Sequence, residues 1–387
     1  MGSNSPIRDP LPSSTSSAVH LTHPTPEERK VTWTLSSRNW GVALSLDDYL
    51  EREEHLMSTP LSRNSGITHW ILTPISSAPN SRPILATCET LRKRALVRTA
   101  DGAIRDVITH GIGSVFADPK HRGRGYAGRM LRDVGERLKT WQTSEGTECL
   151  FSILYSDIGK TYYAGHGWAP FPSTHVEFPP SRQVSSQETV DCAKTLTDAD
   201  LPQLCALDEQ YIRHELSNIK DDRVYVALIP DYDTIVWHHM RENFMTEKLF
   251  GHSPAIKGAI TGEPESRVWA VWTRMYSGPV DKTDSENTLH ILRLVIENGS
   301  ATETAANAKK LKSILELAQQ QAKDWHSGHV ELWNPTSYVK SLVKSLGMKH
   351  SEVSREQDSI ASLRWYGPGC GGVENIEWLG NEKHGWC

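Results

Sequence analysis

The sequence contains no hydrophobic run close to the roughly 20 residues that a membrane-spanning helix needs. Its first residues, MGSNSPIRDPLPSSTSS, lack the apolar core of a signal peptide, and we expect residues 1–17 to form a disordered tail. Positive charge is not in surplus either, since the formal net charge is −5. These absences argue against a membrane partner and against nucleic acid as the main partner.

Paired cysteines are also missing. The six cysteines are scattered, without a Cys-x-x-Cys pair and without histidines at metal-binding spacing. We interpret them as reduced thiols of a cytoplasmic protein, and we predict no metal site.

The chain is too long for one ordinary hydrophobic core, because it has 387 residues. A stretch rich in Pro and Ser marks residues 176–190 as a linker. We therefore expect an N-terminal domain over residues 18–175 and a C-terminal domain over residues 191–387. Strand-like and helix-like segments alternate in both, which predicts a mixed α/β (α+β) fold.

In the N-terminal half, strand patterns surround one long amphipathic helix. Strands are predicted over residues 18–24, 66–74, 84–98, 109–117 and 149–155. Helices are predicted from Thr25 and from Ser45, both good N-caps, and a short helix covers residues 158–165. One apolar stripe runs along the long helix and consists of Ala127, Met130, Leu131, Val134, Leu138 and Trp141. This stripe predicts a helix with one buried face.

The loop before that helix lies in VFADPKHRGRGYAGRML, residues 115–131. Gly123 and Gly125 let the backbone approach a ligand closely, and the following helix points its free N–H groups toward it. Because Arg122 and Arg124 alternate with these glycines, the loop predicts a phosphate site.

The loop sequence also has three other interpretations. A Walker-type loop requires Gly-Lys-Ser/Thr, and Gly125-Tyr126-Ala127 excludes it. A dinucleotide fingerprint fits the letters Gly123-x-Gly125-x-x-Gly128, but five residues separate these glycines from the strand. An exposed turn without a ligand also stays open.

Two motifs resemble the GCN5-related N-acetyltransferase (GNAT) family. Arg122-x-x-Gly125-x-Ala127 is similar to the family's Arg/Gln-x-x-Gly-x-Gly/Ala motif, and Tyr163-x-x-x-Gly167-Trp168 is similar to its later Tyr-x-x-x-Gly-aromatic element. The order of strand, loop, long helix, strand and short helix agrees as well. The resemblance implies a GNAT fold and an acyltransferase that uses acetyl-CoA as co-substrate, without a metal.

The resemblance also implies which residues contact acetyl-CoA. The pyrophosphate would lie on the loop amides, and the pantetheine arm would follow the backbone at the end of the preceding strand. The expected binding residues are Val115, Phe116, Ala117, Arg122, Gly123, Arg124, Gly125, Tyr126 and Ala127.

Catalysis must remove a proton from the acceptor and supply one to the leaving thiolate. A lysine-type amine has a pKa near 10.4 and arrives protonated. By resemblance, Tyr163 is the catalytic acid, with Tyr162 as the alternative. The base stays open among His110, Asp106 and Asp157.

The second half repeats the order of the first without its chemistry. Its loop, ENGSATETA, lacks the Arg/Gly motif, and Val343 stands where Tyr163 stands in the first copy. We expect a degenerate GNAT-like domain that binds no CoA and shapes the substrate site. The final stretch NIEWLGNEKHGWC is too apolar to dangle, and we expect it to pack back near the domain junction.

Over most of its length the chain resembles the fungal lysine acetyltransferases of lysine catabolism. The likeness includes RNWGVALSLDDYLEREEHL, THWIL, GYAGRML and RVWAVWTR. It implies transfer of an acetyl group to the ε-amine of free L-lysine, by direct attack in a ternary complex. The alternatives are a GNAT enzyme for another amine (a polyamine, an amine-bearing metabolite or a protein lysine) and a non-catalytic acetyl-CoA-binding protein.

Overall fold

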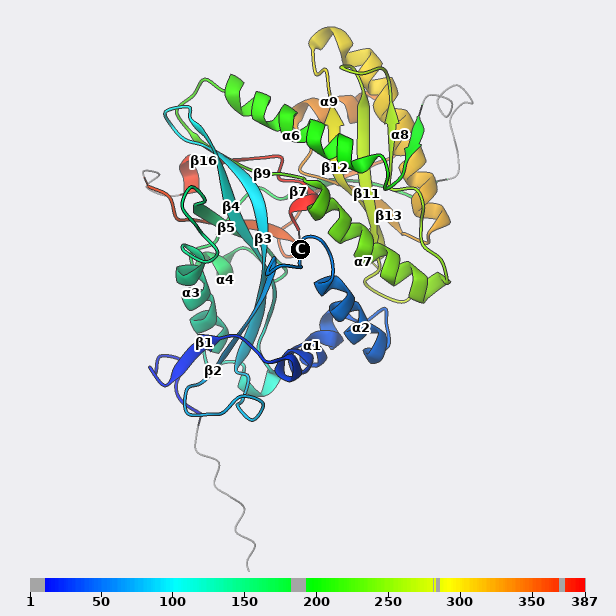
Figure 1. The fold of residues 1–387 in the computed structure, drawn as a ribbon. Helices are drawn as coiled ribbons and strands as arrows, with labels where there is room; N and C mark the ends of the chain where they lie inside the picture. Colours follow the sequence, from blue (N-terminus) through cyan, green and yellow to red (C-terminus); the bar gives the residue numbers. More distant parts are fainter. Residues whose placement is uncertain (1–10, 182–192, 281, 283–285, 369–372, 387) are drawn as a thin grey trace, which may run out of the picture.

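Two β-sheets, each flanked by helices, make up the computed structural model, which describes residues 11–181, 193–280, 282, 286–368 and 373–386 (Figure 1). The first sheet contains β1 (Val19–Thr22), β2 (Ile67–Pro74), β3 (Ala86–Arg98), β4 (Ile104–Phe116), β5 (Cys149–Ser156), β6 (Ala169–Pro170), β9 (Val224–Leu228), β15 (Ile360–Trp365) and β16 (Ile376–Leu379). Its order is β1-β2-β3-β4-β5-β15-β6, with β9 paired to β3 and β16 to β9.

The second sheet has the order β14-β7-β13-β12-β11-β10-β8. Its strands are β7 (Thr174–Phe178), β8 (Lys194–Leu196), β10 (Gly258–Thr261), β11 (Val268–Met275), β12 (Thr288–Ile296), β13 (His329–Trp333) and β14 (Ser351–Ser354). The parallel pair β12–β13 corresponds to the parallel pair β4–β5 of the first sheet. The mixed α/β fold with a repeated unit is confirmed.

Helices cover the faces of both sheets (Figure 1). They are α1 (Pro26–Trp40), α2 (Leu46–Met57), α3 (Tyr126–Leu138), α4 (Thr161–Ala164), α6 (Leu201–Asn218), α7 (Tyr232–Phe250), α8 (Thr304–Asp324) and α9 (Ser337–Ser345), with short 3-10 turns η1 (Pro119–His121), η2 (Ala301–Glu303), η3 (Val373–Asn375) and η4 (Lys383–Gly385). Thr25 and Glu28 form a capping box at α1. On α3, Met130, Leu131 and Val134 are fully buried against the first sheet. None of the helices in the described ranges combines the length and apolar character that a bilayer crossing needs.

The two halves exchange strands: β9, β15 and β16 of the second half belong to the first sheet, and β7 of the first half belongs to the second. Strand β15, from the second half, lies antiparallel between β5 and β6, and β7, from the first half, lies between β13 and β14. Ile360, Ala361 and Leu363 of β15 are completely buried, so this strand is an internal part of the first sheet. Of the expected linker over residues 176–190, residues 176–178 therefore belong to β7, and residues 182–190 lie outside the described residues.

The C-terminal stretch packs back at the junction of the sheets, which confirms the expectation from its sequence (Figure 1). Strand β16 pairs in parallel with β9, and Lys93 Nζ donates to the Gly385 carbonyl over 3.0 Å. Lys383 and His384 are almost fully buried.

Residues 11–17 lie against the start of α3. The Tyr126 hydroxyl donates to the Pro12 carbonyl over 2.6 Å, and Arg129 donates to the carbonyls of Ser14 and Ser16. The tail expected over residues 1–17 is therefore corrected for residues 11–17, because these donors satisfy its carbonyl groups. Residues 1–10 lie outside the described residues.

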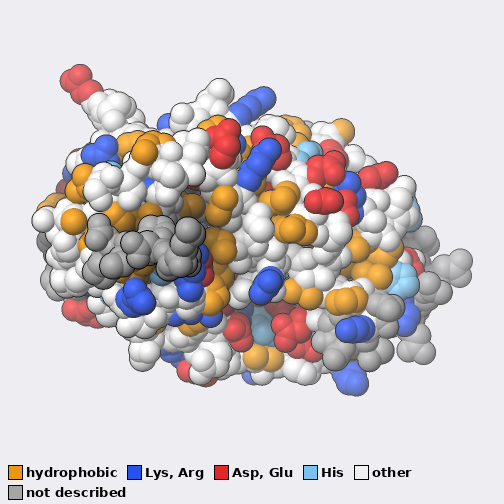
Figure 2. Space-filling model, turned by 90° about the horizontal axis from the view of Figure 1, so that it is seen from below, with side chains coloured by type: hydrophobic (Ala, Val, Ile, Leu, Met, Phe, Trp, Pro, Cys, Tyr) orange, Lys and Arg blue, Asp and Glu red, His pale blue; other side chains and the backbone are white. Residues whose placement is uncertain are grey.

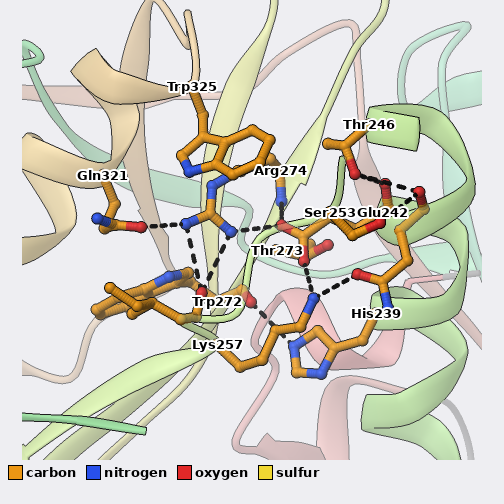
Figure 3. Close-up of polar contacts among 12 residues, drawn as sticks. His239, Glu242, Thr246, Ser253, Lys257, Trp272, Thr273, Arg274, Gln321 and Trp325 are labelled. Carbon is orange, nitrogen blue, oxygen red and sulfur yellow. Dashed lines mark hydrogen bonds and ion pairs between the residues drawn. The ribbon is translucent and has the colours of Figure 1, made fainter. Parts of the chain in front are cut away.

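A buried ion network fixes α7 to the second sheet (Figure 3). Glu242 accepts from Lys257 Nζ and from Arg274 Nη1, both over 2.7 Å, and all three side chains are at most 1% exposed. Arg274 also donates to Gln321 of α8 over 2.7 Å. The network thereby joins α7, the residue before β10, strand β11 and α8.

On the face drawn in Figure 2, acidic and basic side chains are interspersed with apolar ones. No broad basic surface of the kind that binds nucleic acid is present on this face.

Candidate active site

A cavity of about 630 Å³ lies where β4 and β5 diverge. Its wall brings together nearly all residues that the sequence predicted for acetyl-CoA and for catalysis. The predicted residues in this wall are Val115, Phe116, Ala117, Arg122, Gly123, Gly125, Tyr126, Ala127 and Tyr163. Arg124 does not line the cavity and is exposed on the loop. We call this space the acyl cavity.

The divergence of the strands leaves backbone groups of β4 facing the acyl cavity. Pairing of β4 with β5 runs from Ile108 to Ile112 and then stops, while β4 continues to Phe116. Ser114 has a positive φ of 52°, and the register with β3 shifts nearby, which bends the strand away from β5. An extended ligand can pair with the exposed strand edge.

The loop after β4 presents amides rather than side chains. Gly123 and Gly125 have φ of 75° and 77°, the left-handed region that favours glycine. Gly125 is the N-cap of α3 and makes no side-chain capping bond, so the first-turn amides remain available to an anion. Arg122 Nε donates to the Ala117 carbonyl over 3.2 Å and closes the loop. This arrangement is suited to holding a phosphate group.

Tyr163 stands on α4 at the wall of the acyl cavity and is 9% exposed. Burial raises the pKa of its hydroxyl, and the nearby Tyr162 and Asp157 raise it further. The phenol therefore remains protonated at neutral pH and can donate a proton. Tyr162 lines the same cavity but is 36% exposed.

Two of the three candidate bases lie away from the acyl cavity. His110 is completely buried, its imidazole contacts Gln142 and Cys149, and burial lowers its pKa to about 4. Asp106 forms a bidentate pair with Arg213, which lowers the pKa of the carboxyl.

Asp157 is the candidate base that lines the acyl cavity. Its side chain is exposed to the cleft, but the surrounding protein atoms desolvate it and raise its pKa. Ser359 N donates to Asp157 Oδ1 over 3.0 Å and holds the carboxylate in place.

A second cavity of about 630 Å³ shares Asn39, Trp40 and Asp157 with the acyl cavity. We call it the acceptor-side cavity. Its interior carries charged and aromatic groups, chiefly His175, His290, Glu331, Trp333, Arg355 and Lys383. Sequence reasoning missed them, because they come from β7, β12, β13, the segment after β14 and η4. The only hint was the apolar and charged character of the C-terminal stretch.

In the second sheet, the position that corresponds to the acyl cavity, where β12 and β13 stop pairing, is covered by the C-terminal segment. Pairing of β12 with β13 ends at Ile291, and beyond it the Leu294 amide donates to Glu382 over 2.9 Å. Glu382 also pairs with Arg293, so the C-terminal segment lies against this strand edge. Val343 on α9 is buried in the core of the second half.

Within the described residues, no group of three or more His, Cys, Asp or Glu side chains could hold a metal ion.

Residues 175–387, more than half of the chain, match the model of the LYC1 GNAT-like C-terminal domain. The chain belongs to this family. It is similar to the lysine acetyltransferase of Yarrowia lipolytica, with 26% identity over 291 residues that cover 65% of this chain and 71% of that protein.

Solved structures show the same fold. A GCN5-related N-acetyltransferase from Anabaena variabilis has a TM-score of 0.52 at 13% identity, covering 90% of this chain and 72% of that one. The Saccharomyces cerevisiae N-myristoyltransferase with bound myristoyl-CoA also has a TM-score of 0.52, at 10% identity, covering 92% and 81%. The GNAT fold expected from the sequence is confirmed, and the chain is an N-acetyltransferase of the GNAT type.

Proposed function

We propose that this GNAT protein transfers the acetyl group of acetyl-CoA to the side-chain amine of free L-lysine, in a ternary complex. The observation that carries the proposal is the acyl cavity, which places a free strand edge, an amide-rich loop and a protonated tyrosine around one space. The similarity to a lysine acetyltransferase supports the choice of acceptor. The reaction would be a cytoplasmic step of lysine catabolism.

In this proposal the loop and β4 hold acetyl-CoA. The amides from Gly123 to Ala127 and the helix dipole of α3 bind the pyrophosphate. Arg122 and Arg124 add charge at the loop surface. The β4 backbone at Val115, Phe116 and Ala117 pairs with the pantetheine amides.

The reaction joins the amine nitrogen to the thioester carbonyl carbon while the C–S bond breaks. A β4 amide stabilises the oxyanion of the tetrahedral intermediate. Tyr163 donates a proton to the leaving sulfur, and Asp157 accepts a proton from the amine. The net reaction releases one proton, because the amine arrives as an ammonium ion.

The C-terminal domain, expected over residues 191–387, would shape the substrate site. The structure supports this role because β12, β13 and η4 provide much of the wall of the acceptor-side cavity. The N-terminal domain, expected over residues 18–175, would bind acetyl-CoA and carry the chemistry.

The test is CoA release from acetyl-CoA in the presence of free L-lysine, polyamines or lysine-containing peptides. We expect L-lysine to give the highest kcat/KM. Fast release with a peptide or a polyamine, and none with lysine, would replace lysine by that acceptor. Absence of release with every amine, together with acetyl-CoA binding, would indicate a non-catalytic binding protein.

Variants test the catalytic assignment. Tyr163→Phe and Asp157→Asn should each lower kcat by about 100- to 10,000-fold, the usual range for a general acid or base, with unchanged acetyl-CoA affinity. Tyr162→Phe is the matched control and should retain activity within about threefold. A loss confined to the Tyr162 variant would transfer the acid role to that residue.

A further inference from the structure

Two buried basic side chains, Arg355 and Lys383, stand in the wall of the acceptor-side cavity, and burial lowers the pKa of the Lys383 amine to about 7. Arg355 is 8% and Lys383 2% exposed, and no carboxylate of the described residues forms an ion pair with either. Arg355 Nη1 donates to the Thr174 carbonyl over 3.0 Å, but Arg355 Nε and Nη2 are buried without a hydrogen-bond partner. A buried cation is costly unless a counter-charge reaches it. These donors therefore point to an anionic ligand.

An aromatic ring orients both cations. Arg355 Cζ lies 3.9 Å and Lys383 Nζ 4.1 Å from the centroid of the Trp333 ring. Lys383 Nζ also lies 4.2 Å from the ring of Trp386. Cation–π contacts hold both groups in place, while Arg355 Nε and Nη2 keep unused hydrogen-bonding capacity. A ligand carboxylate would supply the hydrogen-bond acceptors and the counter-charge that the aromatic rings do not provide.

One carboxylate is fixed near these cations without pairing to them. Glu331 Oε2 accepts from Trp333 Nε1 over 2.8 Å, and Glu331 Oε1 lies 3.2 Å from His329 Nε2. Burial alone would raise the pKa of Glu331, but the neighbouring histidines outweigh it and hold the pKa well below its usual range. Glu331 is thus a permanent negative charge in the same cavity as Arg355 and Lys383.

The mouth of this cavity is acidic. Glu286, Glu356 and Asp358 are exposed and line it, and Glu177 is half-buried there. An acidic mouth raises the local concentration of cationic substrates. At the other end, Asp157 and Trp40 border the acyl cavity, where the reacting amine must lie.

We propose that the acceptor-side cavity recognises the amino-acid end of a basic α-amino acid. Arg355 and Lys383 bind the α-carboxylate, Glu331 binds the α-ammonium group, and the side chain extends toward Asp157 with its amine at the acyl cavity. This inference rests on the proposed function and specifies how the substrate is selected. Polyamines lack the carboxylate, so the site discriminates against them through Lys383 and the unpartnered donors of Arg355.

The test compares L-lysine with two analogues that each lack one group. Cadaverine lacks the α-carboxylate, and 6-aminohexanoate lacks the α-ammonium group. Titration calorimetry on the full-length wild-type protein measures binding without turnover, and CoA release measures turnover. We expect each analogue to bind at least tenfold more weakly than L-lysine, as loss of a charge-assisted hydrogen bond predicts.

The variant Lys383→Met keeps the length of the side chain and removes its charge. It should weaken L-lysine binding at least tenfold and leave cadaverine binding unchanged, because cadaverine has no group for Lys383. The matched control is Lys344→Met, at an exposed lysine of α9 outside both cavities. Arg355→Gln provides a second variant with the same expectation.

The outcomes separate the two proposals. Selective L-lysine binding without CoA release would support this cavity and contradict the proposed function. CoA release with lysine, but equal affinity for lysine and cadaverine in the wild type, would overturn the cavity assignment alone. The wild-type comparison decides this even if a variant fails to fold.

Discussion

Replacement of Glu242 by glutamine tests the buried network that holds α7. Glu242 is completely buried and accepts three hydrogen bonds of 2.7 Å, from Lys257 Nζ, Arg274 Nη1 and the Arg274 amide. Glutamine keeps the shape but supplies one acceptor and no charge. Lys257 and Arg274 then lose their only carboxylate within the described network.

The magnitude follows from this geometry. Removing one partner of a buried ion pair costs about 3–5 kcal/mol, because the remaining charge is left uncompensated. Typical domains have a total stability of about 5–15 kcal/mol, so the loss is a large share of it. Urea unfolding followed by circular dichroism measures the change.

Two comparisons isolate the cause. Glu247→Gln, at an exposed position of the same helix, should change the free energy of unfolding by less than about 0.5 kcal/mol. The double variant Glu242→Gln/Lys257→Met should recover part of the loss, because one uncompensated cation is removed. A loss below about 1 kcal/mol for Glu242→Gln would refute the argument.

The free energy of unfolding should also depend on pH through Glu242. Burial alone would raise the pKa of Glu242, but the charges of Arg274 and Lys257 outweigh it and lower the pKa below its ordinary value of 4.5. The stabilisation is then fully present above about pH 4.5 and is lost as the pH falls through the lower folded value. The difference between wild type and Glu242→Gln should therefore narrow in acid.

Two further predictions concern the acyl cavity and the exchanged strands. Gly125→Val should abolish acetyl-CoA binding, measured by calorimetry. The backbone φ of Gly125 is 77°, which valine rarely adopts, and a Cβ at this position would lie 2.9 Å from Ser14 Oγ. Gly251 has the same φ with open space around it, so the control variant Gly251→Val should bind acetyl-CoA normally. A chain that ends at residue 181 lacks β15, so we expect it to aggregate on size-exclusion chromatography; a soluble monomer that binds acetyl-CoA would contradict the importance of the exchange.

The acyl cavity could be predicted from the sequence because its determinants are local. Two glycines, the first turn of α3 and the apolar stripe behind it lie within a few turns of chain, and their geometry follows from φ preferences and helix periodicity. Tyr163 reaches the same space because β5 is the only helix or strand between α3 and α4, the short helix that carries it.

Helix α7 was not predicted, although its Asp231 N-cap and Gly251 C-cap are ordinary signals. It lies between α2, the second sheet and η4, so it is buried on several sides and shows no single apolar stripe. Its buried residues also include His238 and Glu242, whose burial depends on partners far away in the chain.

The sequence by itself determined the repeated GNAT pattern, the glycine loop and the catalytic tyrosine candidate, because each depends on neighbours a few residues away. Only the tertiary structure showed where the candidate bases lie: Asp106 pairs with Arg213, more than a hundred residues later, while Asp157 lines both cavities. The acceptor-side cavity likewise forms only after β7 and β15 have each joined the opposite sheet and η4 has packed against β12 and α7. Long-range packing of this kind leaves no periodic trace in the sequence, since each segment contributes one or two residues to the shared wall.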